Sequence, residues 1–318
     1  GKEGTLSDFA NGHHYYGFHR TETGWVYREW APSAHLLFLV GDFNNWQRYT
    51  HPLHRNEHGD WEIRLEGHDA LKHGQRIKVM VQYDYGDHFK IPLYCHRVVQ
   101  EVHADGSIDW MGVIWDPETP YEWHDADFRP VKAAPLIYEA HVGIAQEEGV
   151  ISSFRQFVEY TLPKIKEAGY NAVQLMAIMQ HPYYASFGYH VSNFFAVSSW
   201  FGTPDDFKYL VDSAHQMGLS VYMDLVHSHA VKNTEEGINQ FDGTQEQFFL
   251  PGDAGYHTAW DSMCFDYGKP AVMHFLLSNL KYWLEEFHLD GFRFDGITSM
   301  LFNDHGLGTN FDSYAKYF

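Results

Sequence analysis

A carboxylate and a guanidinium two positions apart are the side chains best suited to chemistry in this sequence. They are Arg293 and Asp295, in a stretch that reads Asp-Gly-Phe-Arg-Phe-Asp. Because side chains alternate along a strand, Phe292 and Phe294 should share one face, against outer helices, while Arg293 and Asp295 point inward. A carboxylate at the end of a strand can attack the anomeric carbon of a sugar, and an adjacent guanidinium keeps it ionised. The alternative is a purely structural Arg–Asp pair inside a barrel.

Two further segments carry side chains that could bind a sugar. Residues 224–229 read Asp-Leu-Val-His-Ser-His and end an earlier strand, so Asp224 and His229 are candidates to hydrogen-bond sugar hydroxyls. A metal site at His227 and His229 is a weaker alternative because no third ligand stands nearby. A structural role for both histidines also stays open. Tyr189 follows another strand, where its ring could lie beneath a glucosyl unit or pack on its neighbours.

These side chains need parallel strands that end at one edge of a sheet. After residue 135, short apolar segments alternate with helical patterns, which indicates parallel strands and favours a (β/α)8 barrel. The helix that begins after Thr203 has a capping residue and Pro204 in its first turn, and Gly218 ends it. The expected strands are residues 136–141 and 172–178, both apolar and buried, and residues 221–226 and 291–295. The other expected helices are residues 153–168 and 270–287.

The first third of the sequence predicts a β-sandwich. Residues 26–30, 61–65 and 76–83 alternate between apolar and polar side chains, and residues 56–60 resemble a hairpin turn. Residues 116–135 hold four prolines, each of which removes a backbone donor and restricts φ. We therefore expect a sandwich domain over residues 13–115, a linker over 116–135 and a barrel domain over 136–318.

Composition restricts the class of partner. The chain has 318 residues, enough for two domains, and its net charge of −20 disfavours nucleic acids and anionic membranes but not a neutral polymer. Aromatic residues make up 17%, and such rings can stack on sugars, although most of them fill cores.

Only two cysteines, Cys95 and Cys264, are present in the sequence. Neither a signal core nor an apolar run of membrane-spanning length is found, so we expect an intracellular protein.

Several motifs together resemble one known family. Residues 187–189, 224–229 and 290–295 occur in the order and on the strands of the α-amylase family, which is glycoside hydrolase family 13. Finer matches resemble its glycogen and starch branching enzymes; they are residues 173–179, 194–196, 227–230, 241–244, 260–262 and 294–300. Residues 29–32 and 41–46, which read Glu-Trp-Ala-Pro and Gly-Asp-Phe-Asn-Asn-Trp, resemble the family 48 carbohydrate-binding module that precedes such barrels.

This resemblance implies a role for each matching residue. Asp295 matches the nucleophile and Arg293 the residue that positions it, while Asp224, His229 and Tyr189 match residues that bind the sugar at the cleaved bond. The implied reaction cleaves an α-1,4-glucan and transfers the chain to a 6-hydroxyl, without a metal or another cofactor, in the cytoplasm or in a plant plastid.

The sequence also departs from the family pattern. Gln180 stands where branching enzymes usually have Glu, and no residue matches the general-acid Glu, which the family carries on the barrel strand after Asp295. We therefore expect only the N-terminal half of the barrel, no activity from the 318-residue chain alone, and association or aggregation through its open edges.

Two alternatives remain open at this point. A debranching enzyme of the isoamylase type shares the module and the barrel, and differs in the linkage that it makes or breaks. A non-catalytic fragment that binds glucan through Trp30, Trp46 or Trp61 is the other, although we expect Trp30 and Trp46 to lie in the sandwich core.

Overall fold

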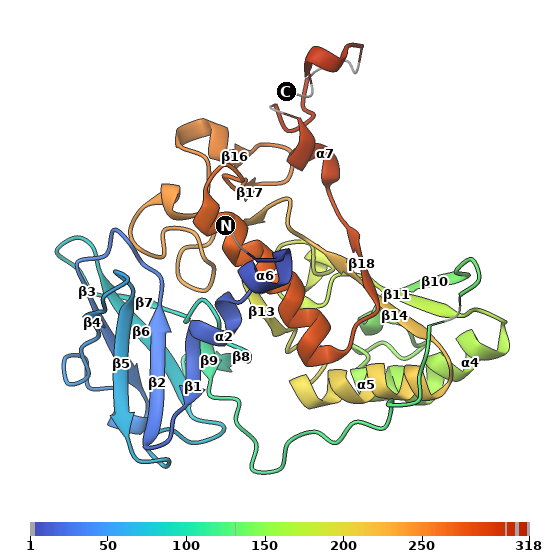
Figure 1. Ribbon diagram of the computed structural model, residues 1–318, viewed down its shortest axis with the longest axis horizontal. Coiled ribbons are helices and arrows are strands. Elements are labelled where there is room, and N and C mark those ends of the chain that lie inside the picture. The colour runs from blue at the N-terminus through green and yellow to red at the C-terminus, as the bar shows by residue number, and fades with distance from the viewer. Residues whose placement is uncertain (1–3, 131, 303, 309–311, 317–318) are drawn as a thin grey trace.

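The protein consists of a β-sandwich and an α/β region, which lie side by side in a computed structural model (Figure 1). The structure describes residues 4–130, 132–302, 304–308 and 312–316. Residues 1–3 at the start of the sequence and Phe318 at its end lie outside the described residues. No helix within the described part of the chain is both long and apolar enough to cross a membrane.

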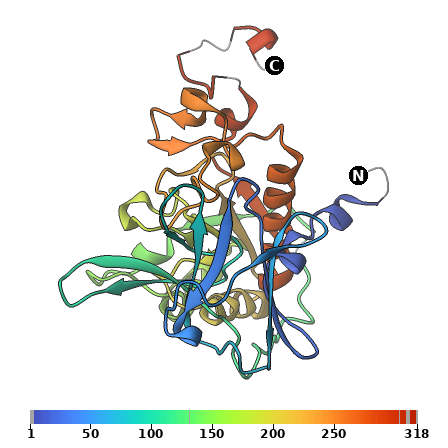
Figure 2. The same cartoon turned by 90° about the vertical axis from the view of Figure 1, so that its left-hand side faces the viewer.

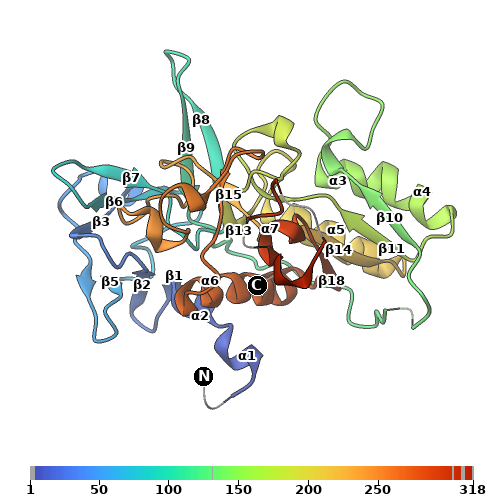
Figure 3. The same cartoon turned by 90° about the horizontal axis from the view of Figure 1, so that it is seen from above.

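Two antiparallel sheets form the sandwich. One has the order β1-β2-β5-β4, and the other the order β3-β6-β9-β8, with β7 paired to β6. The β8–β9 hairpin projects from the body of the molecule (Figures 2 and 3). The strands are β1 (Gly17–Arg20), β2 (Gly24–Glu29), β3 (Leu36–Gly41), β4 (His54–Arg55), β5 (Trp61–Glu66), β6 (Arg76–Gln82), β7 (His88–Lys90), β8 (Val98–Val102) and β9 (Ile108–Val113).

Apolar residues of both sheets meet in the sandwich core. Trp25 and Tyr27 from β2 and Val79 from β6 are almost fully buried in one cluster, as a two-sheet packing requires. The predicted turn between β4 and β5 is confirmed: the Asn56 amide donates to the Asp60 carbonyl over 2.8 Å, and the Asn56 side chain accepts from the Asp60 amide over 3.1 Å.

Four parallel strands form the sheet of the α/β region, in the order β10-β11-β14-β18. This confirms the prediction of four parallel strands. The inner pair is buried, whereas the outer pair is largely exposed, so the prediction of a buried apolar strand at residues 136–141 is wrong. The strands are β10 (Ile137–Ala140), β11 (Ala172–Leu175), β14 (Ser220–Leu225) and β18 (Gly291–Phe294).

Smaller paired strands lie in the loops of this region. β12 pairs with β13, and β15, β17 and β16 form a second small sheet. Their bounds are β12 (Met179–Gln180), β13 (Asn193–Val197), β15 (Ala230–Val231), β16 (Tyr256–His257) and β17 (Ser262–Met263).

Helices cover the sheet where the sequence predicts them. Thr203 caps α5, because its hydroxyl accepts from the Asp206 amide while the Asp206 carboxylate accepts from the Thr203 amide. In Figure 1, α5 lies beneath the parallel sheet and α6 lies between the sheet and the sandwich. The helices are α1 (Leu6–Phe9), α2 (Gly12–Tyr15), α3 (Phe154–Gln156), α4 (Leu162–Glu167), α5 (Pro204–Gln216), α6 (Pro270–Phe287) and α7 (Ile297–Leu301).

The helix predicted over residues 153–168 is interrupted by a π-helical turn. α3 passes into a π segment, Phe157–Thr161, before α4 begins at Leu162. Pro163 has no amide hydrogen to donate to the preceding turn, and its ring crowds the carbonyl four residues earlier. The wider π turn accommodates both effects.

Residues 116–130 run along the lower edge of the molecule between the two regions (Figure 1). Asp125 anchors this segment, because its carboxylate bonds to His215 over 2.8 Å and to His288 over 2.9 Å. His215 also bonds to Asp290 over 2.7 Å, just before β18. The segment therefore connects α5 to the start of the outermost strand.

The sandwich packs on the α/β region through aromatic rings. Tyr94 contacts Phe195 of β13, with 4.4 Å between ring centroids, and Phe275 of α6, with 5.5 Å. Most of the buried apolar residues of both regions belong to one continuous cluster, so burial of these rings stabilises the arrangement of the two regions.

Candidate functional site

The two faces of the parallel sheet differ in polarity. Register places Ala140, Leu175, Met223 and Phe292 in one row across the four strands. These residues belong to the face that packs on the core. The opposite face carries the polar groups, and its C-terminal end holds the residues that the sequence singles out.

Arg293 connects the two carboxylates of this face. Its Nη1 donates to Asp224 Oδ2 over 2.9 Å and to Asp295 Oδ1 over 2.8 Å. Arg293 lies opposite Asp224 in the register of β14 and β18, which is why a single guanidinium nitrogen contacts both. The structure therefore brings together three residues that the sequence placed on two separate strands.

Asp295 is at the end of β18 and stays accessible. Its side chain is 24% exposed, and within the described residues its Oδ2 makes no hydrogen bond. The next residue, Gly296, has a φ of 64°, and a Cβ there would lie 2.5 Å from Ser228 Oγ. Only glycine suits this turn, and the turn leaves the Asp295 carboxylate at the open end of the sheet.

Asp224 is buried, in contrast to Asp295. Its side chain has no exposed area, and burial raises the pKa of its carboxyl, an effect that Tyr189 and Arg293 partly offset. Tyr189 donates its hydroxyl hydrogen to Asp224 Oδ2 over 2.5 Å. Asp224 Oδ1 is buried and has no partner in the described part of the chain, which is a costly state for a carboxylate oxygen unless a ligand satisfies it.

His229 is held by a serine that the sequence argument did not consider. Ser262 Oγ lies 2.6 Å from His229 Nδ1, and both side chains are buried. Burial lowers the pKa of His229 to about 3, so the imidazole is neutral near pH 7. Ser262 is 33 positions from His229 in the sequence, and the pairing of β15 with β17 brings the two together. The family motif at residues 260–262 was the one sequence feature that pointed to Ser262.

His227 does not share a ligand site with His229. Its Nε2 bonds to Asn279 Oδ1 over 2.9 Å inside the protein, and burial lowers its pKa to about 4. Among the described residues, the potential metal ligands that converge are His13, His14 and Glu285 instead. His227 and His229 therefore bond to different partners, Asn279 and Ser262, in the interior.

Two other predictions need correction or detail. Phe292 packs against the core as expected, but Phe294 is 40% exposed because β18 is an outer strand. Gln180 is fully buried, and its Oε1 accepts from the Ser199 amide over 2.8 Å, while its Nε2 has no partner in the described residues. Gln180 thus has a structural contact in the interior.

Trp46 lies outside the sandwich core, contrary to the prediction. It has a left-handed φ of 59°, and its Nε1 donates to Asp42 over 2.9 Å. The turn places the ring at the rim of an open groove of about 840 Å³, which Lys78 and Asp109 also line. Trp61 is buried, and its Nε1 donates to the Ala31 carbonyl. Trp30 is half-buried and packs on Phe248 of the α/β region, with 5.1 Å between ring centroids, so it lies at the junction of the two regions and not inside the sandwich.

Comparison with known proteins gives matches in both regions. Residues 15–95 match carbohydrate-binding module 48 (isoamylase N-terminal domain), and residues 156–254 match the alpha amylase catalytic domain. A 1,4-alpha-glucan-branching enzyme of Dictyostelium discoideum is 48% identical over 99% of this chain and 47% of its own length. One from Arabidopsis thaliana, described as chloroplastic/amyloplastic, is 47% identical over 99% of this chain and 40% of its own.

Solved structures share the fold. A putative alpha amylase from Salmonella typhimurium superposes with a TM-score of 0.71 at 24% identity, over 90% of this chain and 44% of its own. A pullulanase from Bacillus acidopullulyticus gives 0.71 at 19%, over 90% and 38%. The chain spans about half the length of the curated relatives it matches. Its similarity to the alpha amylase catalytic domain lies in residues 156–254, and the relatives that match nearly the whole chain are 1,4-alpha-glucan-branching enzymes.

Proposed function

We propose that the full-length protein containing this sequence is a 1,4-α-glucan branching enzyme with Asp295 as its nucleophile. The observation that carries the proposal is the Asp295 carboxylate, which Arg293 holds by one oxygen while the other oxygen makes no hydrogen bond in the described residues. The branching enzymes that match nearly the whole chain support it. Arg293 positions the nucleophile, and Asp224, His229 and Tyr189 bind the glucosyl unit.

The reaction is a retaining double displacement. Asp295 forms a bond to the anomeric carbon while the glycosidic bond breaks, and a general acid gives its proton to the departing 4-oxygen. A glucan 6-hydroxyl then attacks the same carbon, loses its proton to the conjugate base of that acid, and releases Asp295. The acceptor hydroxyl takes the place of water, so the product is an α-1,6 branch.

The electrostatics of the site suit this chemistry. A guanidinium 2.8 Å from Asp295 favours the ionised, nucleophilic form. The neutral imidazole of His229 can donate or accept a hydrogen bond without adding charge beside the oxocarbenium-like transition state. Asp224 Oδ1, buried without a partner in the described chain, is the atom that we assign to a sugar hydroxyl.

The general acid is the group that the sequence does not supply. The family resemblance puts it on the barrel strand that follows β18, which is the outermost strand of this sheet among the described residues. Positioned acid catalysis contributes on the order of 100- to 10,000-fold. We therefore propose that the 318-residue chain on its own does not form branches.

The test compares the full-length protein with its Asp295→Ala variant on amylose. Branching by the parent lowers iodine staining and creates α-1,6 linkages that proton NMR counts. We expect the variant to lose at least about a thousandfold of this activity, while an Asp105→Asn control in the β8–β9 hairpin keeps it. Asp295→Ala with parental activity would falsify the assignment.

The same measurement separates branching from debranching. A debranching enzyme leaves amylose unchanged and removes α-1,6 linkages from branched glucan. The relatives at 47–48% identity are branching enzymes, whereas the pullulanase is 19% identical and shows the fold alone. Loss of α-1,6 signal from amylopectin without a gain from amylose would favour the debranching alternative.

A second proposal concerns glucan binding by the sandwich. We propose that residues 13–115 form the carbohydrate-binding module, residues 116–135 the linker and residues 136–318 the barrel part. Within the module, we propose that the groove beside Trp46 contacts glucan. A half-exposed indole next to Lys78 and Asp109 offers one apolar face and several hydrogen-bonding groups. Trp46→Ala should weaken retention on glycogen, whereas buried Trp61 is unsuited to contact. Unchanged retention would exclude this groove.

A further inference from the structure

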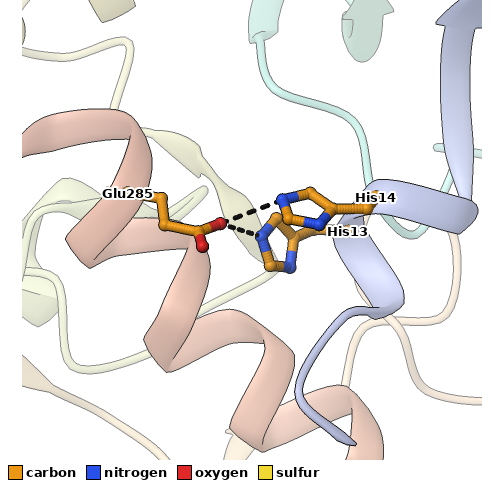
Figure 4. Close-up of side chains that lie close together, drawn as sticks. All are labelled: His13, His14 and Glu285. Carbon is orange, nitrogen blue, oxygen red and sulfur yellow. Dashed lines mark hydrogen bonds and ion pairs between the residues drawn. The ribbon is translucent and has the colours of Figure 1, made fainter. Parts of the chain in front are cut away.

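A group of potential metal ligands lies where the N-terminal segment packs on α6. Figure 4 shows the imidazoles of His13 and His14, from α2, both directed at the carboxylate of Glu285 in α6. The His13 Nε2 is 2.8 Å and the His14 Nε2 is 2.9 Å from the same oxygen, Glu285 Oε2. We propose that His13, His14 and Glu285 form a binding site for a divalent transition-metal ion of the zinc class.

The donor set suits such an ion. Two imidazole nitrogens and one carboxylate oxygen are a common ligand set for zinc, which takes four ligands in a tetrahedron and often leaves one place to water. The three ligand atoms lie within 4.8 Å of one another. Ligands about 2.0–2.1 Å from a tetrahedral ion are about 3.3–3.4 Å apart, so each nitrogen–oxygen distance between a histidine and Glu285 has to lengthen by roughly half an ångström when the metal enters.

Packing holds the ligands in place without metal. The Gly12 amide donates to Ser278 Oγ over 2.8 Å, which docks α2 on α6. A Cβ at Gly12 would lie 2.8 Å from Tyr94 Oη and 2.9 Å from Ser278 Oγ, so this close approach requires glycine. Ser278 and Glu285 are seven positions apart and so share one face of the helix. The contact that sets the helices together therefore also sets the imidazoles over the carboxylate.

One ligand of the proposed site is buried, and the other two are exposed to solvent. The His13 side chain is 5% exposed, while those of His14 and Glu285 are 56% and 43% exposed. Burial lowers the pKa of His13, and a neutral imidazole is the form that binds metal. An ion would thus have one anchored ligand inside and an open side toward water, where it enters and where a fourth ligand binds.

One neighbouring charge opposes the ion. Lys281 Nζ lies 3.5 Å from Glu285 Oε1, the oxygen that faces away from the imidazoles. The ammonium already donates to the Ser7 carbonyl and to Asn11 Oδ1. In addition, His13 Nδ1 is buried without a partner in the described residues, so the site lacks the second-shell bond that tight zinc sites have. We therefore expect binding weaker than that of a closed structural zinc site.

The position of the site gives the metal a structural effect. α2 leads directly into β1 of the sandwich, and α6 leads into β18, which Asp295 follows. An ion held by both would fasten the N-terminal segment to the helix before the catalytic strand. Because metal bound only to the folded state shifts the unfolding equilibrium, it should raise the melting temperature.

The experiment titrates Zn²⁺ into the full-length protein after chelator treatment, by calorimetry, and repeats the titration with Co²⁺, whose visible absorption reports tetrahedral coordination. We expect the affinity of this site for the metal to fall at least about tenfold in His14→Ala and in Glu285→Gln. Under the conditions of the titration, the parent should therefore bind one more equivalent than either variant. His14 and Glu285 are exposed enough for both variants to fold. His58→Ala, which removes another exposed imidazole beside a glutamate, is the matched control and should bind as the parent does.

His14→Gln separates metal binding from hydrogen bonding. Glutamine can still donate to Glu285 but replaces a strong metal ligand with a weak one. If the cluster is a hydrogen-bonded group only, the parent, His14→Gln and His14→Ala will bind the same number of equivalents, and that result overturns the proposal. A tetrahedral Co²⁺ spectrum in the parent that disappears in His14→Gln supports it.

Discussion

The inner and outer strands of the parallel sheet are built from similar residues but lie in different environments. β11 and β14 are almost entirely buried, whereas β10 and β18 expose three and two of their four residues. The candidate site includes residues from both kinds of strand: Asp224 is fully buried on β14, an inner strand, and Asp295 is 24% exposed after β18, an outer strand. The inner strands therefore provide the buried half of the site, whereas the nucleophile lies on the half that faces solvent.

The largest expected effect is on stability, and it compares one inner leucine with one outer leucine. Leu175→Ala, in β11 with no exposed area, should lower the free energy of unfolding by about 2–5 kcal/mol. Leu136→Ala, just before β10 and 59% exposed, should cost less than about 0.5 kcal/mol. Urea unfolding of both variants measures the difference.

The same pair also tests whether β10 gains a neighbour in the full-length protein. If further strands cover this edge, Leu136→Ala will cost more in the full-length protein than in the 318-residue chain. Equal costs for the two leucines in the 318-residue chain would contradict the division into inner and outer strands. The association that we expect through exposed edges remains a prediction, and sedimentation of the 318-residue chain will test it.

The second prediction concerns the guanidinium that joins the two halves. Arg293→Met leaves buried Asp224 without its cation and frees the Asp295 carboxylate. We expect branching activity of the full-length protein to fall about 100- to 1,000-fold, similar to the loss of one preorganised hydrogen-bond donor in other enzymes. Arg155→Met, which breaks the exposed pair with Asp206, is the control and should leave activity within about twofold. Parental activity in Arg293→Met would show that the pair is only structural.

The third prediction concerns the hydroxyl behind His229. Ser262→Ala removes the 2.6 Å contact to Nδ1 and frees the imidazole to rotate or change tautomer. One hydrogen bond of this kind contributes about 0.5–1.5 kcal/mol, so kcat/KM should fall about two- to tenfold. Ser198→Ala removes another buried hydroxyl, one without a partner in the described chain, and should have no such effect. A pattern in which both variants lose activity equally would indicate general damage rather than a specific contact.

The smallest expected effect is a pH dependence at the other end of β18. Burial opposes protonation of His215, but its bonds to Asp290 and Asp125 raise its pKa above the ordinary value. A raised histidine pKa stabilises the folded state below the unfolded value of about 6.5, and this contribution is lost as pH rises through the folded value. Urea midpoints should therefore fall more between about pH 6 and pH 8 in the parent than in His215→Gln. If the urea midpoint changes equally with pH in the parent and in His215→Gln, His215 is not the group that causes the pH dependence.

Local sequence patterns predicted the helices and strands well, whereas contacts between segments far apart in the sequence could not be predicted. α6 begins and ends where Pro270 and the apolar stripe up to Phe287 predict, because caps and periodicity are local. The two-residue spacing of Arg293 and Asp295 fixed their shared face for the same reason. Ser262 on His229 and Glu285 on His13 are contacts over 33 and 272 positions, which no spacing rule reveals.

The errors have equally physical causes. Residues 136–141 were expected to be buried, because an apolar strand looks the same whether or not a neighbour covers it; the structure leaves Ile137 and Tyr138 exposed at an edge. Trp46 was expected in the core, but a left-handed turn at Asn45 and Trp46 points its ring to the groove. Hydrophobicity alone does not specify the direction in which a turn sends a side chain.

The most direct test of the central claim is to trap the intermediate on the outer strand. A fluorinated glucosyl fluoride reacts with a retaining enzyme to form a glucosyl ester that is hydrolysed slowly, and peptide mass spectrometry then locates the modified residue. In the full-length protein, we expect the label on Asp295 and none on Asp224, which stays buried behind Arg293 and Tyr189. A label on Asp224, or on any carboxylate other than Asp295, would contradict the account.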